Sequence, residues 1–204
     1  RRERTNPDGG PKTEVDLAWP RSDIRWTWRI EPGEHALALT AVLVNDGAAA
    51  VTVGNWNVLH LDGDAAGAME LGGDPANVRL FGWRPWAMRV ERLGAADGVH
   101  DSNTLLHLYD PDSATVLLCG FVTLDRMMVD HRLHYRAVGA AAYRATCRFG
   151  TYRLPAGASL VSETLHVAYF DNPHAALEAW ADEVHRRYQP PFTAEAMANY
   201  AGGA

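Results

Sequence analysis

Apolar and polar residues alternate along much of the chain with a period of two. The clearest run covers 24–30, where Arg25, Thr27 and Arg29 separate four apolar side chains: Ile24, Trp26, Trp28 and Ile30. This alternation is typical of a β-strand with one buried face. A longer apolar run, 35–45, ends at Asn45-Asp46-Gly47, which favours a tight hairpin turn. We therefore expect 51–61 to return as its hairpin partner.

Further short segments of the same kind follow, separated by turn-forming residues such as Asp110-Pro111-Asp112 and Pro155-Ala156-Gly157. We expect strands at 77–81, 87–93, 104–109, 115–123, 142–152 and 159–169. Strands at intervals of about ten residues favour an antiparallel sandwich or barrel over a doubly wound α/β fold. The pattern therefore predicts a mainly β protein.

One segment near the C-terminus has the period of an α-helix. Asp171 or Asn172 is suited to cap it, and Pro173 fits its first turn. Its apolar stripe consists of Leu177, Trp180, Ala181, Val184 and Tyr188. We predict a helix over 171–189, after a β domain over 14–170, and interpret the polar residues 1–13 as a loose leader.

Composition narrows the class of protein. The chain has 204 residues, of which 47% are hydrophobic and 22% charged, as in ordinary globular domains. No apolar run approaches the ~18 residues of a membrane span, so we expect no membrane partner. The net charge of −6 argues against a nucleic-acid partner. No signal region is visible, which favours a cytoplasmic location.

Candidate reactive groups are few. His131 and His134 have a spacing that suits two metal ligands on a helix, but the surrounding pattern is not helical. Cys119 and Cys147 lie in apolar stretches typical of buried thiols. No nucleophile elbow, phosphate loop or dinucleotide fingerprint occurs, so we expect no metal and no cofactor. No catalytic pair stands out among six aspartates in mostly turn-like contexts: Asp97, Asp101, Asp110, Asp112, Asp125 and Asp130.

The most informative segment is Phe81-Gly82-Trp83-Arg84-Pro85-Trp86. Pro85 cannot donate a hydrogen bond to a sheet, so this segment belongs to an edge strand or a loop. Each tryptophan carries ~150–250 Å² of surface, enough for an exposed pair to form a binding patch. Either both indoles pack into the core beneath the loop, or at least one lines a ligand site or a domain junction.

Three stretches together resemble the N-terminal domain of glycoside hydrolase family 36, the melibiase-type α-galactosidases. Residues 81–86 are similar to the Asn-Gly-Trp-Gln-Ser-Trp signature of that family, with Phe81, Arg84 and Pro85 in place of its Asn, Gln and Ser. Residues 118–126 are similar to its Leu-Leu-Gly-Phe-Leu-Thr strand, and 162–178 to the strand and helix that close the domain. The three stretches occur in the family's order.

The resemblance implies a galactose-mutarotase-like β-supersandwich, with the helix as a linker to a (β/α)₈ barrel. A barrel needs ~250 residues, so we interpret 190–204 as the truncated start of that domain. Both catalytic aspartates of the family belong to the barrel, so no catalytic residue is transferred to this chain. The residues transferred are Trp83, Arg84 and Trp86, as substrate-binding or domain-junction residues.

These considerations lead us to expect a non-catalytic domain of a glycoside hydrolase, inactive by itself. Its expected partners are its own catalytic barrel and a carbohydrate ligand, and a homo-oligomer is allowed. One alternative is a self-standing carbohydrate-binding module that uses exposed tryptophans. Another is an aldose-mutarotase-like enzyme, whose acid and base would come from His100, His107, His166 and Glu163.

Overall fold

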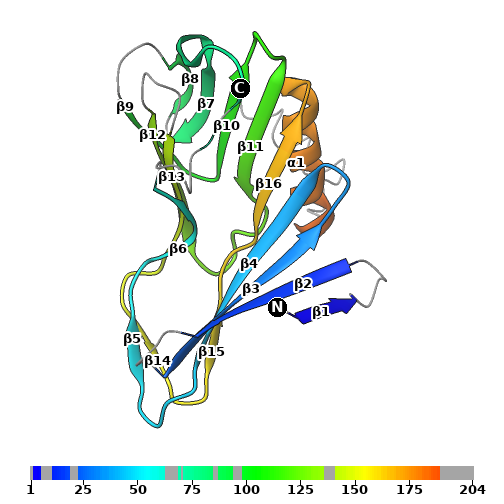
Figure 1. Cartoon of the computed structure of the whole chain (residues 1–204). Coiled ribbons are helices and arrows are strands. Elements are labelled where there is room, and N and C mark those ends of the chain that lie inside the picture. The colour runs from blue at the N-terminus through cyan, green and yellow to red at the C-terminus, as the bar shows by residue number, and fades with distance from the viewer. Residues whose placement is uncertain are drawn as a thin grey trace, which may run out of the picture.

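The computed structural model describes residues 2–5, 11–18, 23–62, 69, 71–84, 87–93, 98–135 and 141–188 (Figure 1). The expected site residue Trp86 and the segment 190–204 lie outside this part of the chain.

A large antiparallel sheet forms one layer of the molecule (Figure 1). Its strand order is β1 (Arg2–Thr5), β2 (Pro11–Ala18), β3 (Ile24–Pro32), β4 (Ala36–Asn45), β16 (Leu165–Phe170), β11 (Thr115–Phe121), β10 (Leu105–Asp110), β7 (Arg79–Arg84) and β8 (Ala87–Arg92). Strand β15 (Ser159–Val161) also pairs with β4. The β7–β8 hairpin therefore lies at one edge of this sheet.

A second antiparallel sheet forms the opposite layer. Its order is β6 (Trp56–Leu61), β13 (Ala141–Arg148), β12 (Met128–Tyr135) and β9 (Gly98–Ser102). A short pair, β14 (Tyr152–Leu154) and β5 (Val51–Val53), extends below it in the view of Figure 1. One 3₁₀ turn, Pro75–Asn77, precedes β7.

The main core lies between the two layers. Strands of the large sheet contribute Leu43, Leu106 and Phe121, and strands of the small sheet contribute Leu133 and Tyr143. The single α-helix among the described residues, α1 (Pro173–Tyr188), covers the other face of the large sheet (Figure 1). A smaller apolar cluster beneath it contains Val116, Leu118 and Ala176. The predicted fold class, a mainly β antiparallel sandwich with a C-terminal helix, is confirmed.

The start of α1 is fixed by Asn172. Its side-chain Oδ1 accepts hydrogen bonds from the backbone N–H groups of His174 (2.8 Å) and Ala175 (3.2 Å). These bonds satisfy amides at the first turn of the helix that have no partner within it. Of the two predicted capping residues, Asn172 is therefore the one that caps the helix. Within the described residues no helix is long and apolar enough to cross a membrane.

Three expectations about the strands were wrong. Segment 51–61 does not pair with 35–45, since β5 pairs with β14 and β6 with β13. Asn45 explains this, because its side-chain nitrogen donates to the carbonyl groups of Ala49 and Leu154 and so directs the chain away from β4. The segment 159–169 is divided between β15 and β16, and 1–13 contains β1 and the start of β2.

Candidate functional site

Trp83 lies near the end of β7, on the edge hairpin of the large sheet. Its backbone N–H donates to Ser102 Oγ (2.7 Å), and its carbonyl accepts from the backbone N–H of Asn103 (2.6 Å). These bonds fix the main chain against the segment that joins β9 and β10. The indole, in contrast, remains 44% exposed. Trp83 is therefore held in place by its backbone, while its ring is partly exposed to solvent.

Trp83 belongs to an apolar surface formed by both strands of the hairpin. In the β7–β8 register Trp83 stands opposite Met88 and Phe81 opposite Val90, so the four side chains share one face of the sheet. Met88 is 68% and Val90 72% exposed. We call this surface, defined by Phe81, Trp83, Met88 and Val90, the hairpin face.

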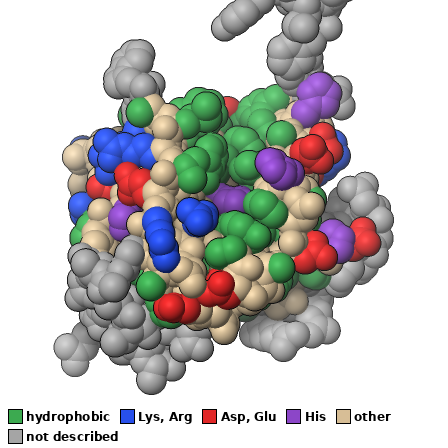
Figure 2. Space-filling view, turned by 90° about the horizontal axis from the view of Figure 1, so that it is seen from above, with side chains coloured by type: hydrophobic (Ala, Val, Ile, Leu, Met, Phe, Trp, Pro, Cys, Tyr) green, Lys and Arg blue, Asp and Glu red, His purple; other side chains and the backbone are tan. Residues whose placement is uncertain are grey.

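Figure 2 looks down on the end of the molecule that carries β7 and β8 in Figure 1, and hydrophobic side chains lie next to one another there. Contiguous apolar surface of this kind usually marks a binding site or an interface.

The sequence pattern does not indicate Met88 and Val90 as site residues. Their alternation with Arg89 and Glu91 predicts a half-buried strand, and β8 is indeed a strand. What the alternation cannot show is that β8 ends the sheet and that no described element covers its apolar side. The proline in 81–86, which indicates an edge, was the signal that pointed to this hairpin.

Arg84 is directed away from the hairpin face, because it follows Trp83 on the strand. Its Nε donates to the backbone carbonyl of Asp101 (3.1 Å), and its guanidinium lies 3.8 Å from the Asp101 carboxylate. The same carboxylate forms an ion pair with Arg132 on β12 (2.9 Å). The structure therefore places Trp83 and Arg84 on different surfaces, and Arg84 adjoins the outer face of the small sheet.

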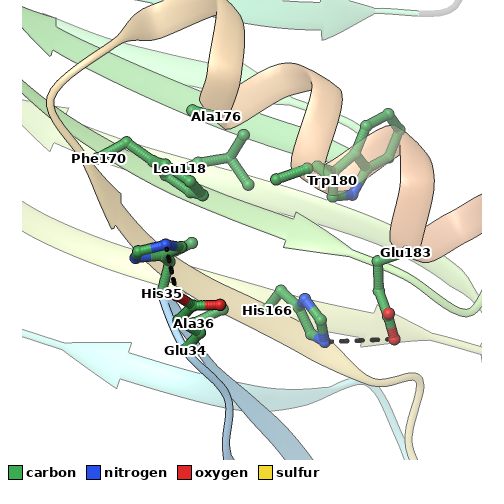
Figure 3. Close-up of a pocket in the computed structure, with 11 residues that line it drawn as sticks. Glu34, His35, Ala36, Leu118, His166, Phe170, Ala176, Trp180 and Glu183 are labelled. Carbon is green, nitrogen blue, oxygen red and sulfur yellow. Dashed lines mark ion pairs between the residues drawn. The ribbon is translucent and has the colours of Figure 1, made fainter.

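A groove of about 180 Å³ lies between α1 and the β3–β4 hairpin (Figure 3). Leu118, Phe170 and Trp180 provide its apolar wall. His166 points toward Glu183 of α1, with 3.8 Å between Nε2 and Oε1. Burial lowers the pKa of His166, an effect that the nearby Glu183 carboxylate opposes. Glu183 is largely buried beside this histidine.

The ionisable groups that line the groove lie in two pairs, Glu34 with His35 (3.7 Å) and Glu183 with His166 (3.8 Å). The Glu183 carboxylate already accepts hydrogen bonds from Arg186 and Arg187, and these bonds, against the effect of burial, lower its pKa. A carboxylate held in this way is ionised and engaged. We interpret the His166–Glu183 pair as a contact that seats the helix on the sheet.

The acid and base required for a mutarotase-like reaction are not assembled. His100 bonds to Glu91 (2.9 Å), and His107 bonds to the carbonyl of Pro173 at the start of α1 (3.2 Å). Glu163 is buried, and its carboxylate accepts hydrogen bonds from the backbone N–H groups of Arg126 (2.6 Å) and Met127 (2.8 Å). These three groups, and His166, therefore bond to separate parts of the structure and do not face one another across a common site.

The remaining candidates also serve the fold. His131 and His134 alternate along β12, so the first points into the core and the second outward, which prevents joint coordination. Among the described residues no group of three potential ligands could hold a metal. Cys119 and Cys147 are buried, as predicted, and both thiols are free. Of the six candidate aspartates, Asp97 lies outside the described residues. The other five have local partners: Arg132 for Asp101, Ser113 for Asp110, Asn77 for Asp112, Tyr188 for Asp125 and Arg148 for Asp130.

Comparison with solved structures places this architecture among β-supersandwiches of the galactose-mutarotase type. A galactose mutarotase-like protein from Clostridium acetobutylicum matches 83% of the chain with a TM-score of 0.53 and 8% identity, over 65% of its own length. An α-galactosidase from Lactobacillus brevis matches 88% with a TM-score of 0.63 and 11% identity. A GH36 α-galactosidase from Geobacillus stearothermophilus matches 87% with a TM-score of 0.60 and 14% identity.

The match covers only part of the two α-galactosidases. The chain spans 25% of the L. brevis protein and 26% of the G. stearothermophilus protein. No family model and no curated protein sequence matches the chain. The likeness to these structures therefore defines the fold.

Proposed function

We propose that this chain is the non-catalytic β-supersandwich domain of a glycoside hydrolase resembling the α-galactosidases, and that it supports a separate catalytic (β/α)₈ barrel. The observation that carries the proposal is the asymmetry of the match: 88% of this chain corresponds to 25% of an α-galactosidase. The three stretches that resemble family 36 agree with it. The intact enzyme would then hydrolyse an α-linked glycoside with retention of configuration.

The interior of the domain supports a structural role. Glu163 and Thr164, from one of the resembling stretches, bond to the turn that ends another. The Thr164 N–H donates to Thr123 Oγ1 (2.8 Å), and the Val122 N–H donates to the Thr164 carbonyl (2.9 Å). Two of the three stretches thus meet in the fold, and these polar groups are engaged in hydrogen bonds to one another.

The hairpin face is the surface that we assign to the junction with the barrel. Trp83, Met88 and Val90 are exposed and apolar, at a sheet edge where an adjoining domain can cover them without opening the core. In this arrangement Trp83 forms part of the wall of the sugar pocket and needs the barrel to complete it.

Activity assays on two proteins test the proposal. The purified 204-residue chain should show no turnover of an aryl α-galactoside. The product of the complete reading frame, if it continues for roughly the ~250 residues or more of a barrel, should be active. Turnover by the isolated chain, or a reading frame that stops at Ala204, would contradict the proposal.

The exposed indole of Trp83 also favours a second candidate, a self-standing carbohydrate-binding module. Calorimetric titration of the chain with galactose, raffinose and glucose separates the two. Heat of binding that disappears in Trp83→Ala would support the module. Absence of heat with all three sugars would support the junction role, in which Trp83 alone makes too little of a pocket.

A further inference from the structure

The outer face of the small sheet is polar and hollowed. A depression of about 390 Å³ lies over β12 and β13, within the range of small-ligand clefts (about 300–1,000 Å³). We call it the arginine hollow. Its lining includes Asn57, Asp101, Asp130, Arg132, Arg144, Thr146 and Arg148. It is distinct from the hairpin face, since Arg84, which points away from that face, bonds to Asp101 in the lining of the hollow.

The charges of the hollow are unevenly paired. Arg132 is bound to Asp101 and Arg148 to Asp130, so both aspartates of the lining are occupied. Arg144 is half-buried and forms no ion pair or hydrogen bond with any residue that the structure describes. The hollow therefore keeps one uncompensated positive charge in a chain whose net charge is −6.

The position of Arg144 makes this charge costly. In the β12–β13 register Arg144 stands directly opposite Arg132, and like charges at such positions destabilise a sheet. A neighbouring hollow of similar size shares these two arginines and adds Asp62, His60 and His134. An anion held between Arg132 and Arg144 would relieve the repulsion. Arginine favours a carboxylate, which its planar fork can bind through two hydrogen bonds.

Neutral groups beside the arginines suit hydroxyl ligands. The Thr146 hydroxyl donates to Asn57 Oδ1 (2.9 Å), which leaves the two N–H donors of the Asn57 amide free of partners in the described structure. Asn55 lines the same depression. A ligand with a carboxylate on one side and hydroxyls on the other would match both sets of groups.

We propose that the arginine hollow binds an acidic sugar, a hexuronate, with its carboxylate on Arg144 and Arg132 and its hydroxyls toward Asn57. The choice of a sugar rests on the proposed carbohydrate function, whereas the choice of a carboxylate rests on the unpaired arginine alone. Failure of the hexuronate to bind would overturn this assignment and leave the role of the domain in a glycoside hydrolase unaffected.

The test is titration of the isotope-labelled chain with galacturonate at low ionic strength, followed by amide chemical shifts. Galactose is the matched neutral probe, because it differs only at C6, where a hydroxymethyl group replaces the carboxylate. We expect shifts on β12, β13 and β6, and affinity for galactose at least about tenfold weaker, since a charge-assisted hydrogen bond is lost. Added salt should weaken galacturonate binding.

Two variants make the test specific. Arg144→Gln should weaken galacturonate binding at least about tenfold. Arg153→Gln, which removes the same charge from an exposed arginine on β14, should leave it unchanged. Equal loss in both variants, equal binding of galactose, or shifts confined to β7 and β8 would overturn the proposal. Equal affinity for acetate would overturn the sugar part and reduce the hollow to a simple anion site.

Discussion

The imidazole of His131 is fully buried between the two sheets, yet both of its nitrogens have partners. In the neutral form Nε2–H donates to the Thr104 carbonyl (3.1 Å), and Nδ1 accepts from the Tyr143 hydroxyl (2.7 Å). Burial lowers the pKa of His131 to about 4 and raises the pKa of Cys119, which also bonds to Tyr143, to about 12. This network is satisfied only while each member is uncharged.

The His131 network predicts a loss of stability in acid. Unfolded His131 takes up a proton near its ordinary pKa of 6.5, and the folded residue only near 4. The unfolded state therefore binds more protons between these values, and the free energy of unfolding falls as pH drops from about 6.5 to about 4, by roughly 3 kcal/mol. Urea unfolding across this range should show a smaller fall in the free energy of unfolding for His131→Gln than for the unsubstituted chain. The difference should be roughly 3 kcal/mol, since the amide does not titrate. An unchanged fall in that variant would contradict the prediction.

The seat of α1 illustrates what the sequence reveals about an element and what it does not. Its period, its cap and Pro173 predict the helix, but nothing local predicts the surface on which it lies. That surface includes Gly120 of β11, where an added Cβ would lie 2.6 Å from the ring of Trp180. Trp180 also donates its Nε1–H to the Phe121 carbonyl (3.1 Å). The helix is thus fixed by contacts between residues about 60 positions apart.

Strands show the same division. Period-two alternation in the sequence correctly predicts β3, because neighbouring side chains of a strand point to opposite faces of the sheet. Pairing depends on contacts that alternation does not encode, and Asn45 overrides the hairpin expected at 45–47 through bonds to Leu154 and Pro155. For the same reason the sequence indicates Trp83 as a candidate site residue but not Met88 or Arg144, whose places in the proposed surfaces depend on the sheet edge and on the β12–β13 register.

Replacement of Gly120 tests the seat of the helix. In Gly120→Ala the added methyl overlaps Trp180, so the indole must shift and its bond to Phe121 lengthens or breaks. We expect a loss of about 1–3 kcal/mol in the free energy of unfolding, measured by urea titration, with a change in tryptophan fluorescence. Gly54→Ala is the matched control, because nothing lies within 4 Å of its Cβ position. Equal losses in the two variants would argue against a role for the Gly120–Trp180 contact.

At the scale of the whole molecule, the two layers bury one shared core, and α1 covers part of the outer face of the large sheet. The described structure leaves two surfaces of opposite character, the apolar hairpin face and the charged arginine hollow. Neither is needed to close the core, since Met88 and Val90 are largely exposed and Arg132 and Arg148 face outward. A molecule whose core closes without these two surfaces can present both of them to another domain or to a ligand.

An uncovered hairpin face has a consequence for the isolated chain. Among the described strands β8 has no neighbour on its outer edge, and an apolar surface beside such an edge favours association between copies, through side-chain burial and strand pairing. We expect concentration-dependent self-association in sedimentation velocity and a clear reduction in Val90→Lys, where a charge enters the 72%-exposed position.

Met128→Lys places the same charge at a 74%-exposed methionine on β12 and should leave association unchanged. Because both side chains are exposed, neither variant should lose more than about 0.5 kcal/mol of stability, so a difference between them reports on the surface alone. If the two variants associate equally, the hairpin face is not the contact, and its assignment as the domain junction loses its physical basis.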